Sequence, residues 1–376
     1  PRIRLACSQI LPFRLTPAQE RALEEILGDL PGPAPMSRLL HGEVGSGKTV
    51  VALLAAVAAM ESGCQVALMV PTEILAEQHY QTLGRLLART GHRTALLTSG
   101  QASLQRRAAL KALAGGSVGL VVGTHALIQD GVEFLRLGLV IVDEQHRFGV
   151  RQRMLLQEKG HHPHLLLMTA TPIPRSLALV LYGDMEVSVL DEVPRGRGVV
   201  RTVLRTSADR EKIHAFIRRE AEEGRRTAIV YPLVRESEGS DLRSAVSEAR
   251  ILARGPLSGV AVGLLHGRMS PEERSRALDG FAGGRTPVLV TTTVVEVGID
   301  VPEATVMVVE NAERFGLAQI HQLRGRVGRG AEQSYCILVT DKLSENGRER
   351  SERVTMIPET AERTQSRRAC QSKKTF

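Results

Sequence analysis

A sequence of 376 residues is long enough for two or three domains, each with its own hydrophobic core. Apolar residues make up 43% of the chain, which excludes global disorder, and the longest apolar run, residues 50–60, is shorter than the roughly 18 residues that a membrane span needs. The formal net charge of +8 favours a polyanionic partner, nucleic acid first, although a basic protein without such a partner has the same charge.

The cysteine and aromatic residues indicate which kinds of site and which modes of nucleic-acid binding to expect. The four cysteines are scattered and form no C-x-x-C pair, so we expect neither a disulfide framework nor a zinc site, and a reducing cytoplasm fits best. Aromatic residues make up only 3%, which disfavours extensive base stacking and favours phosphate contacts from Lys, Arg, Thr and backbone amides. The chain begins with Pro1, without a secretory segment, and we expect it to be a fragment.

The first predicted element is a helix that follows a connector over residues 1–13. Thr16 is expected as its N-cap and Pro17 as its first residue, and apolar residues continue at helical spacing to Gly28. Gln19 offers both a donor and an acceptor, so it is a candidate for contacting an adenine edge. The alternative is a solvated helix residue. A proline-rich turn then leads into a strand.

The strongest motif is a phosphate-binding loop at the end of that strand. Gly42, Gly47, Lys48 and Thr49 match the pattern G-x-x-x-x-G-K-[ST]. Glycines allow backbone N–H groups to turn inward around phosphate oxygens, and the helix that follows points its positive end at them. Lys48 is expected to reach the β- and γ-phosphates, and the Thr49 hydroxyl to bind Mg²⁺. The predicted nucleotide-binding residues are Gly42, Glu43, Val44, Gly45, Ser46, Gly47, Lys48, Thr49 and Val50.

Apolar strands then alternate with amphipathic helices. The predicted strands span residues 66–70, 94–97, 120–122, 139–142 and 165–168. Strands separated by helices imply right-handed crossovers and a parallel sheet, with ligands bound at the carboxyl ends of the strands. The sequence therefore predicts an α/β fold with a first lobe over residues 14–190.

The fourth of these strands runs into a second nucleotide-site motif. Asp143 is expected to hold Mg²⁺ through water, and Glu144 to orient or deprotonate the attacking water. Gln145 and His146 lie where they could sense the γ-phosphate, although His146 fits an ordinary loop residue equally well. The motif strengthens the prediction of a nucleoside triphosphate site.

Small hydroxyl residues and then a polar segment end the first lobe. Thr169 and Thr171 suit a loop that couples the nucleotide state to the rest of the lobe. Residues 191–198 are rich in Gly, Pro and charged residues and are interpreted as a hinge between two lobes.

A second βα alternation over residues 199–341 forms the other predicted lobe. Its predicted strands include residues 227–231, 260–265, 288–292 and 306–309, and its predicted helices residues 210–223, 241–252 and 271–281. No further phosphate loop occurs here, so this lobe is expected to reach a nucleotide only from across a cleft. Residues 342–376 are polar without a sustained period and are interpreted as a disordered or frame-shifted tail.

The second lobe also carries a cluster of arginines. Arg326 and Arg329 are three residues apart, which puts them on one face of a helix or helical turn. Guanidinium groups suit phosphate oxygens, so both are predicted to reach a γ-phosphate held by the first lobe. Such a group contributes about 10³ to 10⁵ in rate. The alternative is a basic surface helix.

Together these residues resemble the superfamily 2 helicases and, within them, the RecG type of branched-DNA helicase. The resemblance covers nearly everything from residue 11 to residue 340. In the first lobe, the motifs on which the resemblance rests are residues 11–19, 42–49, 71–78, 123–127, 143–149 and 169–175. In the second lobe, these motifs are residues 264–269, 292–300 and 313–329.

The resemblance implies two RecA-like lobes with ATP and Mg²⁺ in the cleft between them. It implies that Phe13 and Gln19 lie near the adenine, that Gly298 and Asp300 face the nucleotide from the second lobe, and that Gln322 acts with the arginines. It further implies contacts to the DNA backbone from Pro71, Thr72, Thr124, His125, His266 and Thr292. A cytoplasmic, monomeric motor on duplex or branched DNA, without a membrane partner, is expected.

The chain departs from this family at both ends. The family's N-terminal wedge domain and the helical hairpin after its second lobe have no match here, so we expect a retained ATP site and poor fork unwinding. The related transcription-repair coupling factors typically carry Glu at the position of Gln145 and Tyr at that of His321. Two further alternatives are an RNA-directed helicase and a nucleotide-gated DNA-binding module with weak hydrolysis.

Overall fold

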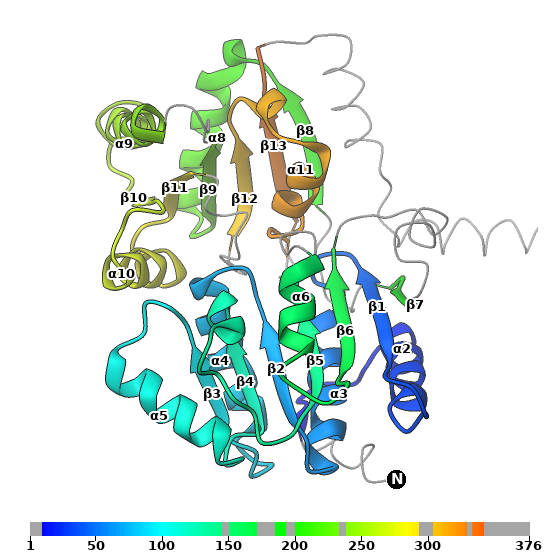
Figure 1. The fold of residues 1–376 in the computed structure, drawn as a ribbon. Coiled ribbons are helices and arrows are strands. Elements are labelled where there is room, and N and C mark those ends of the chain that lie inside the picture. Colours follow the sequence, from blue (N-terminus) through cyan, green and yellow to red (C-terminus); the bar gives the residue numbers. More distant parts are fainter. Residues whose placement is uncertain are drawn as a thin grey trace, which may run out of the picture. The chain divides into compact units, whose positions relative to one another are not determined.

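The computed structural model describes residues 10–144, 150–170, 185–192, 200–232, 238–292, 304–328 and 333–341. Two compact units divide the chain between residues 194 and 195, within the segment predicted as a hinge. Each unit is built on its own parallel sheet, so the predicted α/β class with two lobes is confirmed (Figure 1). Within the described ranges, no helix combines the length and the apolar character that crossing a membrane requires.

The first unit holds a seven-stranded sheet with the strand order β3-β4-β2-β5-β6-β1-β7, in which neighbouring strands pair in parallel. Its strands are β1 (Ser37–Gly42), β2 (Gln65–Met69), β3 (Thr94–Leu97), β4 (Leu120–Gly123), β5 (Leu137–Val142), β6 (His164–Thr169) and β7 (Glu186–Leu190). All five strands predicted from apolar runs are present. Because the strands are parallel, their carboxyl ends lie along one edge, where β1 leads into the phosphate loop and β5 into Asp143.

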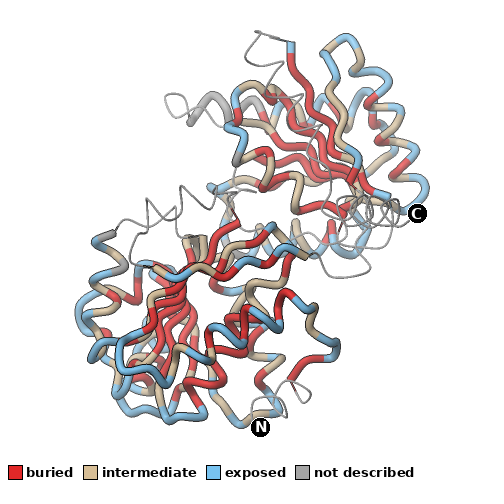
Figure 2. Tube along the Cα trace, turned by 90° about the vertical axis from the view of Figure 1, so that its right-hand side faces the viewer, coloured by how far each residue is buried: buried red, intermediate tan, exposed pale blue. Residues whose placement is uncertain are grey.

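Helices cover both faces of this sheet (Figure 1). One face packs against α2 (Pro17–Asp29), α3 (Lys48–Glu61) and α4 (Glu73–Leu87), and the other against α5 (Ser103–Ala114), η1 (His125–Ile128) and α6 (Val150–Gln157). Strand β5 serves both cores: Leu139 and Ile141 point to the first and Val140 and Val142 to the second. Figure 2 shows the buried strands inside this double layer.

Strand β7 and helix α6 are not predicted by the sequence. The alternating Glu186–Leu190 pattern of β7 gives a weak signal, and the strand is held by a tertiary contact instead. The buried Arg38 of β1 donates to Ser188 Oγ at 2.8 Å and pairs with Asp29 at 2.7 Å and Glu25 at 3.2 Å. One guanidinium group therefore joins β1 and β7 to α2.

His164, the first residue of β6, gives a testable pH dependence. Its Nδ1 accepts the backbone N–H of Met36 at 2.9 Å, which requires an unprotonated nitrogen. Burial lowers the pKa of His164 below its ordinary value, and Asp29 raises it by less. Since the lowered pKa makes the folded state bind fewer protons, the stabilising contribution is complete above about pH 6.5 and is lost as the pH falls below it.

We expect the urea midpoint of the protein to fall between pH 7.5 and 5.5, and to fall less in His164→Asn. The asparagine oxygen can accept the same amide and does not titrate. Urea unfolding followed by circular dichroism at both pH values measures the difference. Equal pH slopes in the two proteins would contradict the assignment.

The second unit holds a six-stranded parallel sheet with the order β10-β11-β9-β12-β13-β8. Its strands are β8 (Val200–Arg205), β9 (Arg226–Tyr231), β10 (Val262–Leu265), β11 (Val288–Thr292), β12 (Ala304–Val309) and β13 (Ser334–Val339). Strand β13 is not predicted, because a short apolar run does not distinguish a strand from a buried helical segment. It lies between β12 and β8, where Cys336 and Leu338 are fully buried.

The predicted helices of the second unit are present. They are α8 (Arg210–Glu222), α9 (Glu238–Arg254) and α10 (Pro271–Ala282). Helix α11 (Leu317–Arg324) and the short helical turns η3 (Ser207–Asp209) and η5 (Ala312–Arg314) are further elements of this unit. Apolar residues of α8 and α9 pack against alternate residues of the sheet and form one core. Helix α10 begins with a complete capping box between Ser270 and Glu273.

Candidate nucleotide site

The phosphate loop connects β1 to α3. Gly45 and Gly47 have φ angles of 84° and 86°, in the left-handed region that glycine adopts at little cost. A Cβ atom on Gly47 would lie 2.2 Å from the Gln19 side-chain nitrogen. Gly47 is also the N-cap of α3, so Lys48 and Thr49 form its first turn, where backbone N–H groups have no partners within the helix. The loop therefore needs glycine for both backbone conformation and space.

Lys48 is held within this loop. Its Nζ donates to the carbonyl oxygens of Gly42 at 2.7 Å and Glu43 at 2.9 Å. Both acceptors are neutral backbone groups that sit next to the first turn of α3. The ammonium group can exchange these carbonyls for the oxygens of a bound phosphate.

Gln19 joins helix α2 to the phosphate loop. It is only 3% exposed, so the alternative of a solvated helix residue is wrong. Its side-chain nitrogen donates to the Ser46 carbonyl at 2.8 Å, and its side-chain oxygen accepts the Thr16 N–H at 3.0 Å in a capping box. Phe13, which precedes this helix, is 52% exposed. Gln19 thus supports the shape of the loop as well as being a candidate for an adenine contact.

We expect Gln19→Ala to lower the free energy of unfolding by about 1–3 kcal/mol, because the buried Ser46 carbonyl loses its donor. It should also weaken ATP binding, since the loop loses its brace to α2. Urea unfolding and titration with a fluorescent ATP analogue measure the two effects. Glu20→Ala, on the exposed face of the same helix, is the control, and wild-type values for Gln19→Ala would contradict the role of Gln19.

Asp143 lies at the carboxyl end of β5, with its two carboxylate oxygens in different contacts. Oδ1 accepts the backbone N–H of Glu144 at 2.9 Å, and Oδ2 lies 3.4 Å from Nε2 of His79. Burial acts to raise the pKa of Asp143, but the hydrogen bond and charge of His79, together with Lys48 and the Glu144 amide, lower it below its ordinary value. The group is therefore a carboxylate at neutral pH. Glu144 follows with a φ angle of 50°, which turns the chain sharply at the site.

These residues fit a magnesium ion bound mainly through phosphate and water. Hard oxygen donors suit Mg²⁺, which commonly takes only one or two protein ligands beside substrate phosphates. Thr49 offers a hydroxyl and Asp143 an ionised carboxylate. In the part of the chain that the structure describes, no group of three or more His, Cys, Asp or Glu residues could hold a metal by itself.

The polar residues that follow β2, β4 and β3 lie at one edge of the first sheet, because these three strands are neighbours. Thr72 is the N-cap of α4, and Thr124 is buried directly after β4. His125 Nε2 lies 3.2 Å from the Ser99 hydroxyl, and Glu73 accepts the Gly100 N–H at 2.8 Å. Sequence reasoning missed Ser99 and Glu73, although Ser99 follows a strand of the sheet as the predicted residues do.

Two predicted residues meet in the same way in the second unit. His266 follows β10 and Thr292 ends β11, and these strands are adjacent. Burial lowers the pKa of His266, and its Nδ1 has no hydrogen-bond partner among the described residues. The Thr292 hydroxyl is likewise buried without a partner in the described ranges.

The arginine cluster follows the end of α11. The helix ends at Arg324, and Arg326 lies in the hydrogen-bonded turn after it, with its N–H donating to the Leu323 carbonyl at 3.0 Å. Gln322 and Arg326 are both buried, Arg326 being 8% exposed. This burial disfavours the alternative of a basic surface helix.

Thr169, which was predicted to lie in a coupling loop, is the last residue of β6 in the first unit and is buried.

Six predicted site residues lie outside the described residues. They are Gln145, His146, Thr171, Gly298, Asp300 and Arg329. Their roles stay predictions.

Comparison with known proteins identifies the family. The family model for DEAD/DEAH box helicases matches residues 16–180, and the model for the helicase conserved C-terminal domain matches residues 209–331. The ATP-dependent DNA helicase RecG of Synechocystis is 53% identical over 343 residues, and that of Bacillus subtilis is 51% identical over 343 residues. The chain belongs to the superfamily 2 helicases. Its sequence is of the RecG type.

This helicase chain spans about half the length of the curated relatives it matches. The two alignments cover 91% and 90% of this chain, but 41% and 50% of the relatives. A solved structure of RecG bound to a three-way DNA junction has 46% identity and a TM-score of 0.77, covering 95% of this chain and 47% of that one. Yeast Dbp5 bound to RNA and ADP BeF3 has a TM-score of 0.69 at 20% identity, covering 96% of this chain and 92% of that one, and shares the fold alone.

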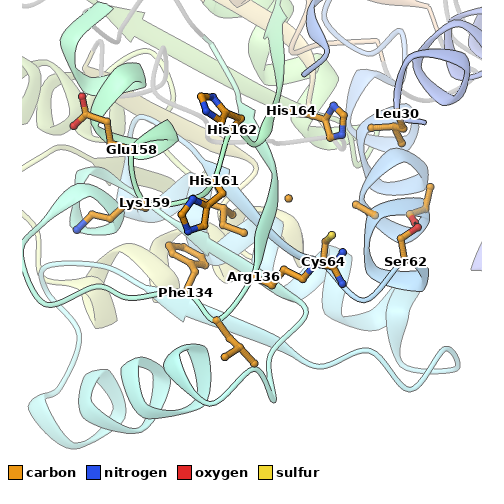
Figure 3. A pocket seen from close by; sticks show the side chains of 16 residues that line it. Leu30, Ser62, Cys64, Phe134, Arg136, Glu158, Lys159, His161, His162 and His164 are labelled. Atoms are coloured by element: carbon orange, nitrogen blue, oxygen red, sulfur yellow. The ribbon is translucent and has the colours of Figure 1, made fainter. Parts of the chain in front are cut away.

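A cavity of about 740 Å³ lies at the other end of the helicase's first sheet (Figure 3). The last turn of α3, the segments leading into β2 and β5, and the loop before β6 line it, with Cys64, Arg136 and His161 among the lining residues. In a parallel sheet, ligands bind at the carboxyl ends of the strands, and Lys48 is absent from the lining. This cavity is therefore not the nucleotide site.

Proposed function

We propose that the chain is the motor of an ATP-dependent DNA helicase that acts on branched DNA. The observation that carries the proposal is the convergence of Lys48 and Asp143 in the first unit, where the charge of Lys48 helps to keep the Asp143 carboxyl ionised. This pairing of a phosphate-binding cation with a metal-binding carboxylate is what triphosphate hydrolysis requires. Family membership and RecG relatives at about 50% identity support the same function.

The chemistry is the hydrolysis of the bond between the β- and γ-phosphates of ATP. Loop amides and Lys48 would hold the phosphates, and Thr49 and Asp143 would hold Mg²⁺, which would offset phosphate charge. Glu144 takes a proton as the water oxygen attacks the γ-phosphorus and ADP leaves. Arg326 and Arg329, with Gln322 beside them, stabilise the charge on the transferred group.

DNA is proposed to bind along the strand ends that carry Thr72, Thr124 and His125 in the first unit and His266 and Thr292 in the second. Hydroxyls, imidazoles and backbone amides there contact phosphates rather than bases, which suits a motor that moves along any sequence. Closure on ATP and reopening after hydrolysis would alternate the two grips.

Branched DNA is the proposed substrate because the RecG relative was solved on a three-way DNA junction. The alternatives remain a transcription-repair coupling type of translocase, an RNA-directed helicase and a nucleotide-gated module with weak hydrolysis. A monomeric state and a cytoplasmic location stay predictions.

ATP turnover measured with no nucleic acid, duplex DNA, forked DNA and RNA tests the proposal. We expect forked DNA to stimulate turnover most and RNA least. The affinity for DNA should fall with salt by a log–log slope of about −0.9 per phosphate contacted. Equal stimulation by RNA would favour the RNA-directed alternative, and nucleotide binding without turnover would favour the binding module.

A further inference from the structure

We propose that His79 is a positioning residue that fixes the Asp143 carboxylate and links DNA contact at the start of α4 to the magnesium site. The proposal rests on the proposed function and adds a residue to which sequence motifs assign no role. It starts from one contact, the 3.4 Å separation between His79 Nε2 and Asp143 Oδ2.

The contact is enclosed. The His79 side chain is 13% exposed and that of Asp143 is 14% exposed, so water competes little for either group. An N–H at Nε2 is all that the contact needs, and a neutral imidazole can supply it.

His79 completes the restraint on the carboxylate. Rotation about the terminal bond of an aspartate is only weakly restricted, so one contact leaves the oxygens free to turn. The Glu144 amide holds Oδ1 and His79 faces Oδ2. Groups that orient a metal ligand in this way typically contribute 10–100-fold to metal affinity. We therefore expect His79 to set the concentration of Mg²⁺ that the site needs.

Helix α4 connects this contact to the DNA side of the first unit. Its N-cap is Thr72, a proposed DNA contact, and His79 is seven residues further along, about two helical turns. Ala76, Leu83 and Leu87 pack the helix into the core, so its N-cap and His79 belong to one packed element. A shift at the N-cap on DNA binding would change the distance between His79 and Asp143. DNA binding would then change the Mg²⁺ concentration that the site needs, and helix α4 would transmit the effect.

The test compares His79→Ala with His79→Gln, whose amide nitrogen can replace Nε2. Gln81→Ala, on the exposed side of α4, is the matched control. The first measurement is Mg²⁺ titration of the binding of a fluorescent ATP analogue. We expect His79→Ala to raise the half-saturating Mg²⁺ concentration by about 10–100-fold, with His79→Gln and Gln81→Ala close to wild type. Binding without Mg²⁺ should be the same in all four proteins.

The second measurement repeats the titration as ATP turnover with and without forked DNA. DNA should lower the half-saturating Mg²⁺ concentration in the wild type and in His79→Gln, but not in His79→Ala. Wild-type Mg²⁺ dependence in His79→Ala, or failure of His79→Gln to restore it, would overturn the proposal. If instead no nucleic acid stimulates the wild type, the proposed function fails, while the binding titration still decides the role of His79.

Discussion

Lys48→Ala is expected to lower ATP turnover by at least about 10²–10³-fold, in line with the loss of one preorganised group that stabilises developing charge. The wild-type ammonium lies at the start of α3, beside the loop that would enclose the phosphates, and it donates to the backbone carbonyls of Gly42 and Glu43. Alanine removes the only cation in residues 42–49 and leaves the loop glycines in place. Steady-state ATP turnover with saturating forked DNA measures the effect.

The fold should survive this substitution, because Lys48 donates to backbone carbonyls of its own loop. We expect an unchanged urea midpoint, which separates loss of chemistry from loss of structure. Lys159→Ala is the matched control, since that lysine also donates to a backbone carbonyl, that of Gln129, at 3.0 Å. Turnover of Lys48→Ala near the wild-type rate would mean that the hydrolytic site lies elsewhere.

Arg326→Ala is expected to lower turnover by about 10³–10⁵-fold while leaving ATP binding by the first unit within a few-fold of wild type. The physical reason is that, under the proposed function, a guanidinium group of the second unit would act on the charge that develops during transfer and not on the ground-state nucleotide. Turnover and binding of a fluorescent ATP analogue, measured on the same protein, distinguish these effects. Arg329→Ala is expected to behave in the same way.

Arg326 is buried, so its removal can also destabilise the second unit. Arg326→Lys keeps the charge and most of the volume but not the planar fork, and should retain the fold while losing most of the turnover. Arg219→Ala, at an exposed position of α8, is the matched control for removing an arginine. A turnover defect that disappears in Arg326→Lys would indicate a role for charge alone.

The arrangement of strands was largely predictable from local pattern. The run over residues 139–142 predicted a buried strand, and the structure extends it to Leu137–Val142. The apolar residues of this strand serve two cores at once, which is why the run is continuous rather than alternating. By contrast, the place of β1 between β6 and β7 depends on contacts between residues far apart in the sequence, such as the hydrogen bond from Arg38 to Ser188. The local spacing of apolar residues does not predict such contacts.

The candidate nucleotide site was predictable from the sequence where its residues follow strands. Lys48 and Asp143 are 95 residues apart, but parallel strands bring their carboxyl ends to one edge, and motif spacing then identifies both. Gln19 was identified only by the donor and acceptor of its amide and by the resemblance, because its bond to the Ser46 carbonyl is a tertiary contact. His79 was missed for a similar reason: its partner lies on another element, and a histidine on an amphipathic helix carries no motif.

The most direct test is the distance distribution between spin labels on the two units, with and without a non-hydrolysable ATP analogue, Mg²⁺ and forked DNA. Non-natural amino acids at Leu104 and Ile251, both well exposed, would carry the labels without using the native cysteines. If a triphosphate is clamped between Lys48 and Arg326, the complete mixture should narrow the distribution to one peak in the wild type and not in Lys48→Ala. A distribution that stays unchanged in a wild-type protein that still hydrolyses ATP would contradict the clamp.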